Sequence, residues 1–166
     1  MKKDFRHDLE PRDLILALKG AEVLLALINE TQTDSMIERV TWTLSILCGA
    51  THARTAAIKD LNIVVIILDS LAKLIFWKEE ENILSNCITA LSHLLPLVEM
   101  DKNNKKVWER LIQLLTHHSM TIKRAGILAI SNIISLNDMQ CQVSIINLHF
   151  NNINLSLLLN AISLLI

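Results

Sequence analysis

The sequence is poor in the residues that usually interrupt or cross-link a chain. It contains three glycines, two prolines, three cysteines and no tyrosine, and aromatic residues make up 4% of its 166 positions. So few turn-forming and β-favouring residues argue for helices rather than sheets. The cysteines lie far apart and form no CxxC pair, so we expect free, buried thiols in a reducing compartment.

The chain also lacks an excess of charge and a membrane segment. Its formal net charge is −1, which gives no general attraction to nucleic acid or to an anionic membrane. Residues 1–13 contain no apolar stretch of the kind found in signal peptides. The most apolar run, 61–76, is too short to cross a bilayer and contains Asp69 and Lys73. We therefore expect a soluble, intracellular protein without nucleic-acid or membrane partners.

An apolar motif recurs three times along the chain. The segments "TWTLSILC", "ITALSHLL" and "ILAISNII" align without gaps at 41–48, 88–95 and 127–134, with a serine in register in each. A second apolar segment precedes each of them by 17 or 18 residues. Two helical segments per unit, with a period near forty residues, are typical of solenoids of the armadillo or HEAT type. The predicted fold class is all-α, a right-handed α-solenoid of armadillo repeats.

The same alignment divides the chain into repeats of one array that covers residues 1–166. We expect a first repeat over 12–52, a second over 53–97, a third over 98–136 and a partial fourth over 137–166. Helix-starting residues support this division. Asp34 or Ser35 is expected to cap the helix that contains Trp42, and Ser119 to cap the last helix of the third repeat.

Two long segments resemble importin-α, a family of armadillo-repeat proteins. Residues 12–49 end in "WTLSILCG", which is similar to the "WTLSNLCRG" signature of the family's fourth repeat. Residues 110–143 resemble the sixth repeat, in which the family reads roughly "ALRAVGNIVTGxDxQTQV". The intervening stretch, which ends in "SNCITALSHLL", resembles the fifth repeat more weakly, and the C-terminal residues resemble part of a seventh.

The resemblance implies a peptide-binding role. Importin-α binds the basic nuclear localisation signals of cargo proteins along a concave groove, through W-x-x-x-N motifs on successive helices. Tryptophan and asparagine four residues apart share one helix face. Indole rings hold lysine stems, and the asparagine amide bonds to the peptide backbone. The expected partners are therefore basic peptide segments, the expected location is cytoplasm and nucleus, and no cofactor is implied.

None of the three Trp/Asn pairs is complete in this chain. Trp42 keeps the tryptophan of the first pair, but Ile46 occupies its asparagine position. Asn132 keeps the asparagine of the third pair, whereas Leu128 replaces a polar or basic residue. Binding of basic peptides is therefore expected to be weakened. The candidate peptide-binding residues of the concave groove are Glu38, Trp42, Ile46, Asn86, Thr89, His93, Leu128, Asn132 and Asp138.

Several of these residues have a simpler explanation. Trp42 could fill the core instead of facing a ligand, Glu38 could be a solvated helix charge, and His93 could be incidental. The arginine-rich segment that binds importin-β is not found in the N-terminal residues, so importin-β is not expected to bind this chain. An alternative role is a structural armadillo fragment that self-associates, or docks on another chain, through open apolar ends.

Enzymatic activity is not expected. The sequence contains no nucleophile–base motif, glycine-rich phosphate loop or nucleotide-binding fingerprint. His117 and His118 are adjacent, so on a helix their side chains would diverge by about 100°, which disfavours a shared metal. The basic segment 102–106 lacks interleaved aromatic residues and is expected to be a solvated turn.

Overall fold

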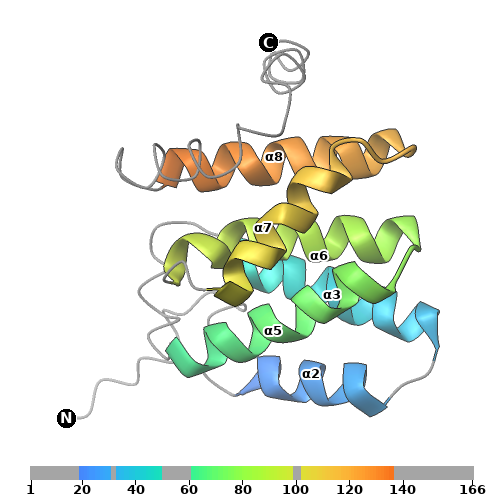
Figure 1. Ribbon diagram of the computed structural model, residues 1–166. Helices are drawn as coiled ribbons and strands as arrows, with labels where there is room; N and C mark the ends of the chain where they lie inside the picture. Colours follow the sequence, from blue (N-terminus) through green and yellow to red (C-terminus); the bar gives the residue numbers. More distant parts are fainter. Residues whose placement is uncertain (1–18, 31–32, 50–60, 99–101, 137–166) are drawn as a thin grey trace.

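The computed structural model describes residues 19–30, 33–49, 61–98 and 102–136, and this part of the chain is helical without any strand. Consecutive α-helices pair as antiparallel hairpins (Figure 1). The helices are α2 (Gly20–Glu30), α3 (Asp34–Cys48), α5 (Leu61–Trp77), α6 (Glu81–Leu94), the short 3₁₀ helix η2 (Leu95–Leu97), α7 (Lys102–Leu114) and α8 (Met120–Leu136).

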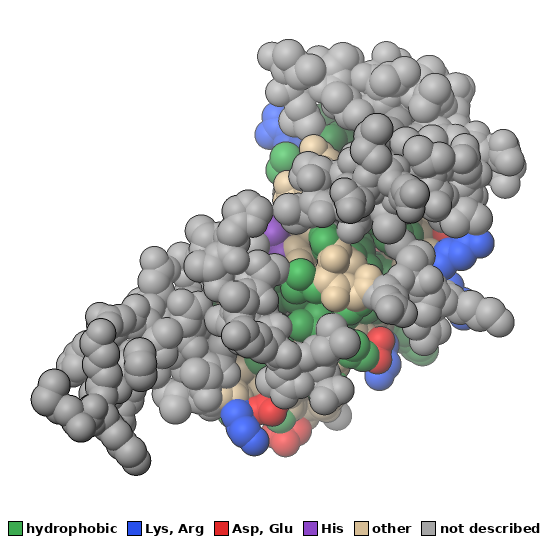
Figure 2. All heavy atoms as spheres, turned by 90° about the vertical axis from the view of Figure 1, so that its left-hand side faces the viewer, with side chains coloured by type: hydrophobic (Ala, Val, Ile, Leu, Met, Phe, Trp, Pro, Cys, Tyr) green, Lys and Arg blue, Asp and Glu red, His purple; other side chains and the backbone are tan. Residues whose placement is uncertain are grey.

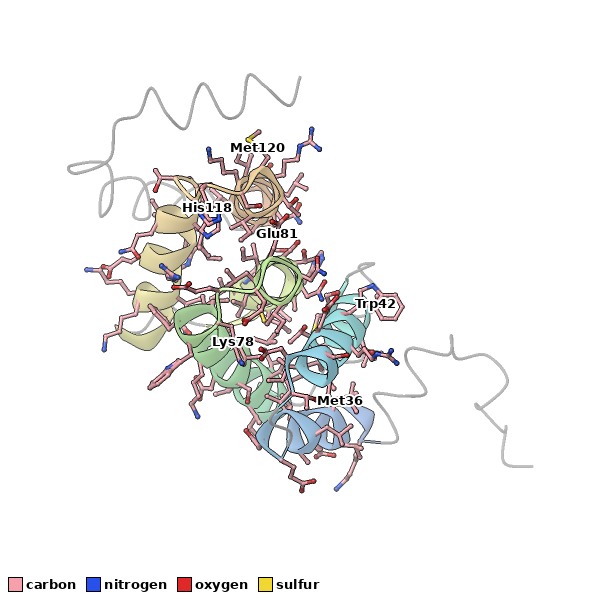
Figure 3. All side chains as sticks on the ribbon, turned by 90° about the vertical axis from the view of Figure 1, so that its right-hand side faces the viewer. Met36, Trp42, Lys78, Glu81, His118 and Met120 are labelled. Atoms are coloured by element: carbon pink, nitrogen blue, oxygen red, sulfur yellow. The ribbon has the colours of Figure 1, made fainter. Side chains whose placement is uncertain are left out.

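The hairpins stack into two layers. Helices α3, α6 and α8 form one layer and α2, α5 and α7 form the other (Figures 1 and 3). Helix α6 lies in the centre and packs most extensively against α3 and α8 of its own layer, and then against α5. Each hairpin buries its apolar faces against the next one, as in a repeat array. The predicted all-α armadillo-type solenoid is confirmed.

The core follows the helical period of the apolar residues. Helix α6 buries almost every hydrophobic side chain because it has neighbours on three sides, and its Leu91 and Ile88 are completely inaccessible. Cys48 and Cys87 are free and buried in this core, as expected, whereas Cys141 lies outside the described residues. Burial raises the pKa of both described thiols to about 12, so neither forms a reactive thiolate near neutral pH.

The serines in register make the same bond in two repeats. The Ser45 hydroxyl donates to the carbonyl oxygen of Trp42 and the Ser92 hydroxyl donates to that of Thr89, both at 2.7 Å. This bond back to the same helix allows a hydroxyl to be buried beside apolar side chains. The third serine of the register, Ser131, is exposed on α8.

The helix starts differ in how they are capped. Ser119 caps α8 as expected, since its hydroxyl accepts a bond of 3.4 Å from the amide of Ile122. The expectation that Asp34 or Ser35 caps α3 is wrong, because the N-cap residue is Thr33, without a side-chain cap bond. Asp34 instead forms an ion pair with Lys78, just after the end of α5.

The helix pairs α2–α3, α5–α6 and α7–α8 lie within the ranges 12–52, 53–97 and 98–136. The exact repeat boundaries stay a prediction, and the partial fourth repeat, 137–166, lies outside the described residues.

None of the described helices combines the length and hydropathy needed to span a membrane. Figure 2 shows hydrophobic side chains at the end of the stack where α3 and α6 terminate.

Candidate peptide-binding surface

A hollow of about 400 Å³ lies between α3 and α6. This α3–α6 hollow is lined by Glu38, Arg39 and Trp42 of α3 and by Asn82, Ser85 and Asn86 of α6. Glu38 and Arg39 precede Trp42 by four and three positions, and Ser85 and Asn86 follow Asn82 by three and four, so the residues of each helix come from adjacent turns on one side of it. Three of the nine candidate residues, namely Glu38, Trp42 and Asn86, are therefore brought together in one place.

Trp42 is a surface side chain. It is 57% exposed, and Figure 3 shows it projecting from α3 on the side away from α5 and α7. At 100° per residue, Trp42 is rotated by about 200° from Leu44, which points into the core. The alternative in which Trp42 fills the core is thus wrong for this structure. An exposed indole beside a hollow can accept an aliphatic stem or a cation on its ring face.

Two of the grouped polar residues bond across the two helices. The Asn82 amide donates to the Glu38 carboxylate over 2.9 Å. The Asn86 amide donates to the Glu38 backbone carbonyl and to the Thr41 hydroxyl, at 3.3 and 3.4 Å. These bonds fix the spacing of α3 and α6 at the hollow. The Glu38 carboxylate still has acceptor positions for a ligand, because an ionised carboxyl group offers about four.

Three residues of the hollow are not among the nine candidate residues of the sequence analysis. Arg39 precedes Trp42 by three positions, Asn82 precedes Asn86 by four, and Ser85 lies between these two asparagines. Helical spacing from the motif positions is the signal that points to them. Arg39 is exposed and lines the same hollow as Glu38, so the hollow carries a positive charge as well as a carboxylate.

The other candidates continue along the same layer without lining the hollow. Thr89 is exposed one turn after Asn86, and its hydroxyl donates to the Ser85 carbonyl at 2.9 Å. His93 is half-buried near the end of α6. The remaining candidates are Ile46, exposed on α3, Leu128, exposed on α8, and Asn132, half-buried on α8, while Asp138 lies outside the described residues.

A polar cluster lies at the start of α6 and in the turn that precedes α8 (Figure 3). Hydrogen bonds from Thr121 and Ser119 lower the pKa of Glu81, at the start of α6. His117 and His118 lie in the turn between α7 and α8 with ring centroids 4.1 Å apart, so the expectation that they diverge on a helix is wrong. Partial burial, and next the charge of His118, lower the pKa of His117. Among the described residues, no group of three or more His, Cys, Asp or Glu is arranged to hold a metal.

Comparison with known proteins relates this chain to one family. The importin subunit alpha-1b of Oryza sativa subsp. japonica is 34% identical over 140 residues, which are 79% of this chain. This chain is related to the armadillo repeats of importin-α. Importin subunit alpha-3 of Arabidopsis thaliana is 30% identical over 80% of the chain, and importin subunit alpha-1a of the same rice is 33% identical over 79%.

The relationship covers most of this chain but little of its relatives. The chain spans 24% of the length of each of these importin-α subunits. No protein-family model matches it. The aligned part is long enough to hold several armadillo repeats, which agrees with the stacked hairpins of the structure.

Proposed function

We propose that this chain is a protein-binding module of nuclear import that receives extended basic peptides along the α3–α6–α8 layer. The observation that carries the proposal is the exposed Trp42 ring beside the Glu38 carboxylate in the α3–α6 hollow. A lysine stem lying on the indole would direct its ammonium group toward this carboxylate. The sequence relationship to importin subunits alpha supports the same class of partner.

The binding we propose is weak. Ile46 stands where an asparagine amide would bond the peptide backbone, and its side chain is exposed and apolar. Loss of such an anchor typically costs about 1–3 kcal/mol, which is about one to two decades in Kd. The exposed guanidinium of Arg39 adds repulsion for a lysine-rich ligand. The module acts in the cytoplasm and nucleus as a binding protein rather than an enzyme.

A titration with two fluorescent peptides tests this function. We expect a lysine-rich peptide to bind more tightly than the same peptide with alanine at the lysine positions. Trp42→Ala and Glu38→Gln should each weaken binding of the lysine-rich peptide, by about threefold or more. Trp77→Ala is the matched control, since it removes another exposed tryptophan from the opposite layer. Equal and negligible affinity for both peptides would reject the proposal.

A gain of affinity provides a stricter test of the same site. Arg39→Ala removes the positive charge next to Glu38 and should tighten binding of the lysine-rich peptide by about twofold, an effect that disappears at high salt. A merely structural role of this surface would not produce tighter binding. Light scattering on the same samples tests the alternative role, in which the chain self-associates. A monomer at high protein concentration would contradict that alternative.

A further inference from the structure

Helix α5 carries an apolar face that the described core does not cover. Its buried side chains recur with helical spacing from Val64 to Ile75 and face α6 and the rest of the core. On the other side, Val65, Ile66, Phe76 and Trp77 are exposed by 42, 50, 50 and 83%. A helix of a folded protein usually presents polar residues to water, so this face has the composition of a contact surface.

The C-terminal half of this face borders a second hollow. This α5–α7 hollow has a volume of about 370 Å³. Phe76 and Trp77 of α5 and Val107 of α7 contribute large apolar side chains, and the same two helices contribute Asp69, Lys73 and Lys106. The α5–α7 hollow therefore combines aromatic side chains with charged ones.

Positive charge predominates around the α5–α7 hollow. Lys73 and Lys106 are exposed. Arg110 bonds through its Nε to the Ile75 carbonyl at 3.0 Å, and this contact holds its guanidinium carbon 6.0 Å from the centre of the Phe76 ring. Among the described residues, two lysines thus line the α5–α7 hollow against the single carboxylate of Asp69, and the Arg110 guanidinium lies beside the Phe76 ring. A ligand with complementary charge for such a site is acidic.

We propose that the α5–α7 hollow binds a peptide segment of a partner protein in which a bulky apolar side chain is flanked by carboxylates. The apolar side chain packs on Trp77 and Phe76, because exposed aromatic rings supply large contact area with little loss of side-chain entropy. The flanking carboxylates pair with Lys73 and Lys106. This site lies in the layer opposite Trp42, so it is separate from the basic-peptide site and selects the opposite charge (Figure 3).

The test uses the whole chain and two labelled peptides of equal length. The first probe has the core Asp-Glu-Leu-Phe-Asp-Glu, and the second has asparagine or glutamine at its four acidic positions, so that it carries no charge that the α3–α6–α8 layer could bind. We expect the acidic probe to bind and the uncharged probe to bind at least tenfold more weakly. Binding of the acidic probe should weaken at least tenfold in the double variant Lys73→Glu/Lys106→Glu and in Trp77→Ala.

Matched variants separate this site from general effects. Lys105→Glu makes the same charge change as Lys106→Glu alone, at an exposed position that does not line the α5–α7 hollow, and it should change affinity by less than about threefold. Trp42→Ala should leave the acidic probe unaffected. Because the lysines are exposed, their variants keep the test valid even if Trp77→Ala does not fold.

Four results would overturn the proposal. These are no detectable binding of the acidic probe, equal binding of both probes, and the same loss of affinity in Lys105→Glu as in the double variant. The fourth is self-association of the chain that Trp77→Ala abolishes, since a second copy would then occupy the α5–α7 hollow. Each result leaves the lysine-rich peptide titration of the α3–α6–α8 layer unaffected.

Discussion

Replacement of Leu91 by alanine tests the central place of α6. Leu91 is completely buried in the helix that packs against α3, α5 and α8. The substitution deletes buried apolar atoms and leaves a cavity, which the helices on three sides cannot move to fill. Leu→Ala changes at such sites typically cost about 2.7–5.0 kcal/mol, and we expect about 3 kcal/mol or more here. That is a large part of the roughly 5–15 kcal/mol that stabilise a typical domain.

The free energy of unfolding is measured by urea denaturation, followed by circular dichroism at the helical band. For a chain of this size, a loss of about 3 kcal/mol corresponds to a fall in Tm of about 6–12 °C. Leu128→Ala is the matched control, because the same atoms are removed from a side chain that is 53% exposed on α8. Its expected cost is within about 0.5 kcal/mol of zero.

The comparison of the two leucines decides the prediction. If Leu91→Ala costs less than about 1 kcal/mol, or no more than Leu128→Ala, then α6 is not enclosed by its neighbours as the structure has it. The two-layer arrangement would then be refuted, and with it the separation of the two proposed binding sites. A change of the urea m-value in Leu91→Ala alone would instead indicate that the stack no longer unfolds as one unit.

Three further predictions concern Trp108, Glu81 and Asn86. In a Trp42→Phe/Trp77→Phe variant, Trp108 is the remaining tryptophan, and its side chain is only 2% exposed. Its fluorescence should resist quenching by iodide and should lie at shorter wavelength than that of the wild type. Efficient quenching would contradict the burial of Trp108. Because the pKa of Glu81 is lowered in the folded protein, its carboxylate stabilises the fold at any pH above the ordinary glutamate pKa near 4.5. This stabilisation is lost as the pH falls through the lower pKa of the folded state. Glu81→Gln should therefore reduce the loss of stability on acidification, and an unchanged pH profile would argue against the hydrogen bonds to this carboxylate. Asn86→Ala removes two long hydrogen bonds to α3, and should lower the unfolding free energy by about 0.5–1.5 kcal/mol in urea titrations.

The fold could be predicted from the sequence because its signals are local. Apolar residues with helical spacing define each helix, and their recurrence near every forty residues defines the stacking. Ser45 and Ser92 illustrate this, since equal positions in two repeats make the same hydrogen bond to their own helices. The exposure of Trp42 follows from the same periodicity, because the core face of α3 leaves it on the opposite side.

Contacts between helices could not be predicted in the same way. The Asn82–Glu38 bond joins residues 44 positions apart, so it depends on how closely α3 approaches α6, which no periodic pattern states. The capping of α3 is a second example, because Asp34 forms an ion pair with Lys78, whose position depends on where α5 ends. His117 and His118 show a third limit, since α7 ends before them and places both rings in a turn.

The two proposed sites differ in charge preference because they use different exposed faces of one core. The α3–α6 hollow has a carboxylate next to an exposed indole, whereas the α5–α7 hollow has lysines next to exposed aromatic rings. A helix pair buries one stripe of each helix and leaves the opposite stripes free to vary. Substitutions on one free stripe therefore change the ligand of one layer without disturbing the core or the other layer. Because none of the described side chains lines both hollows, the free energies of the two binding events should add when both peptides are present.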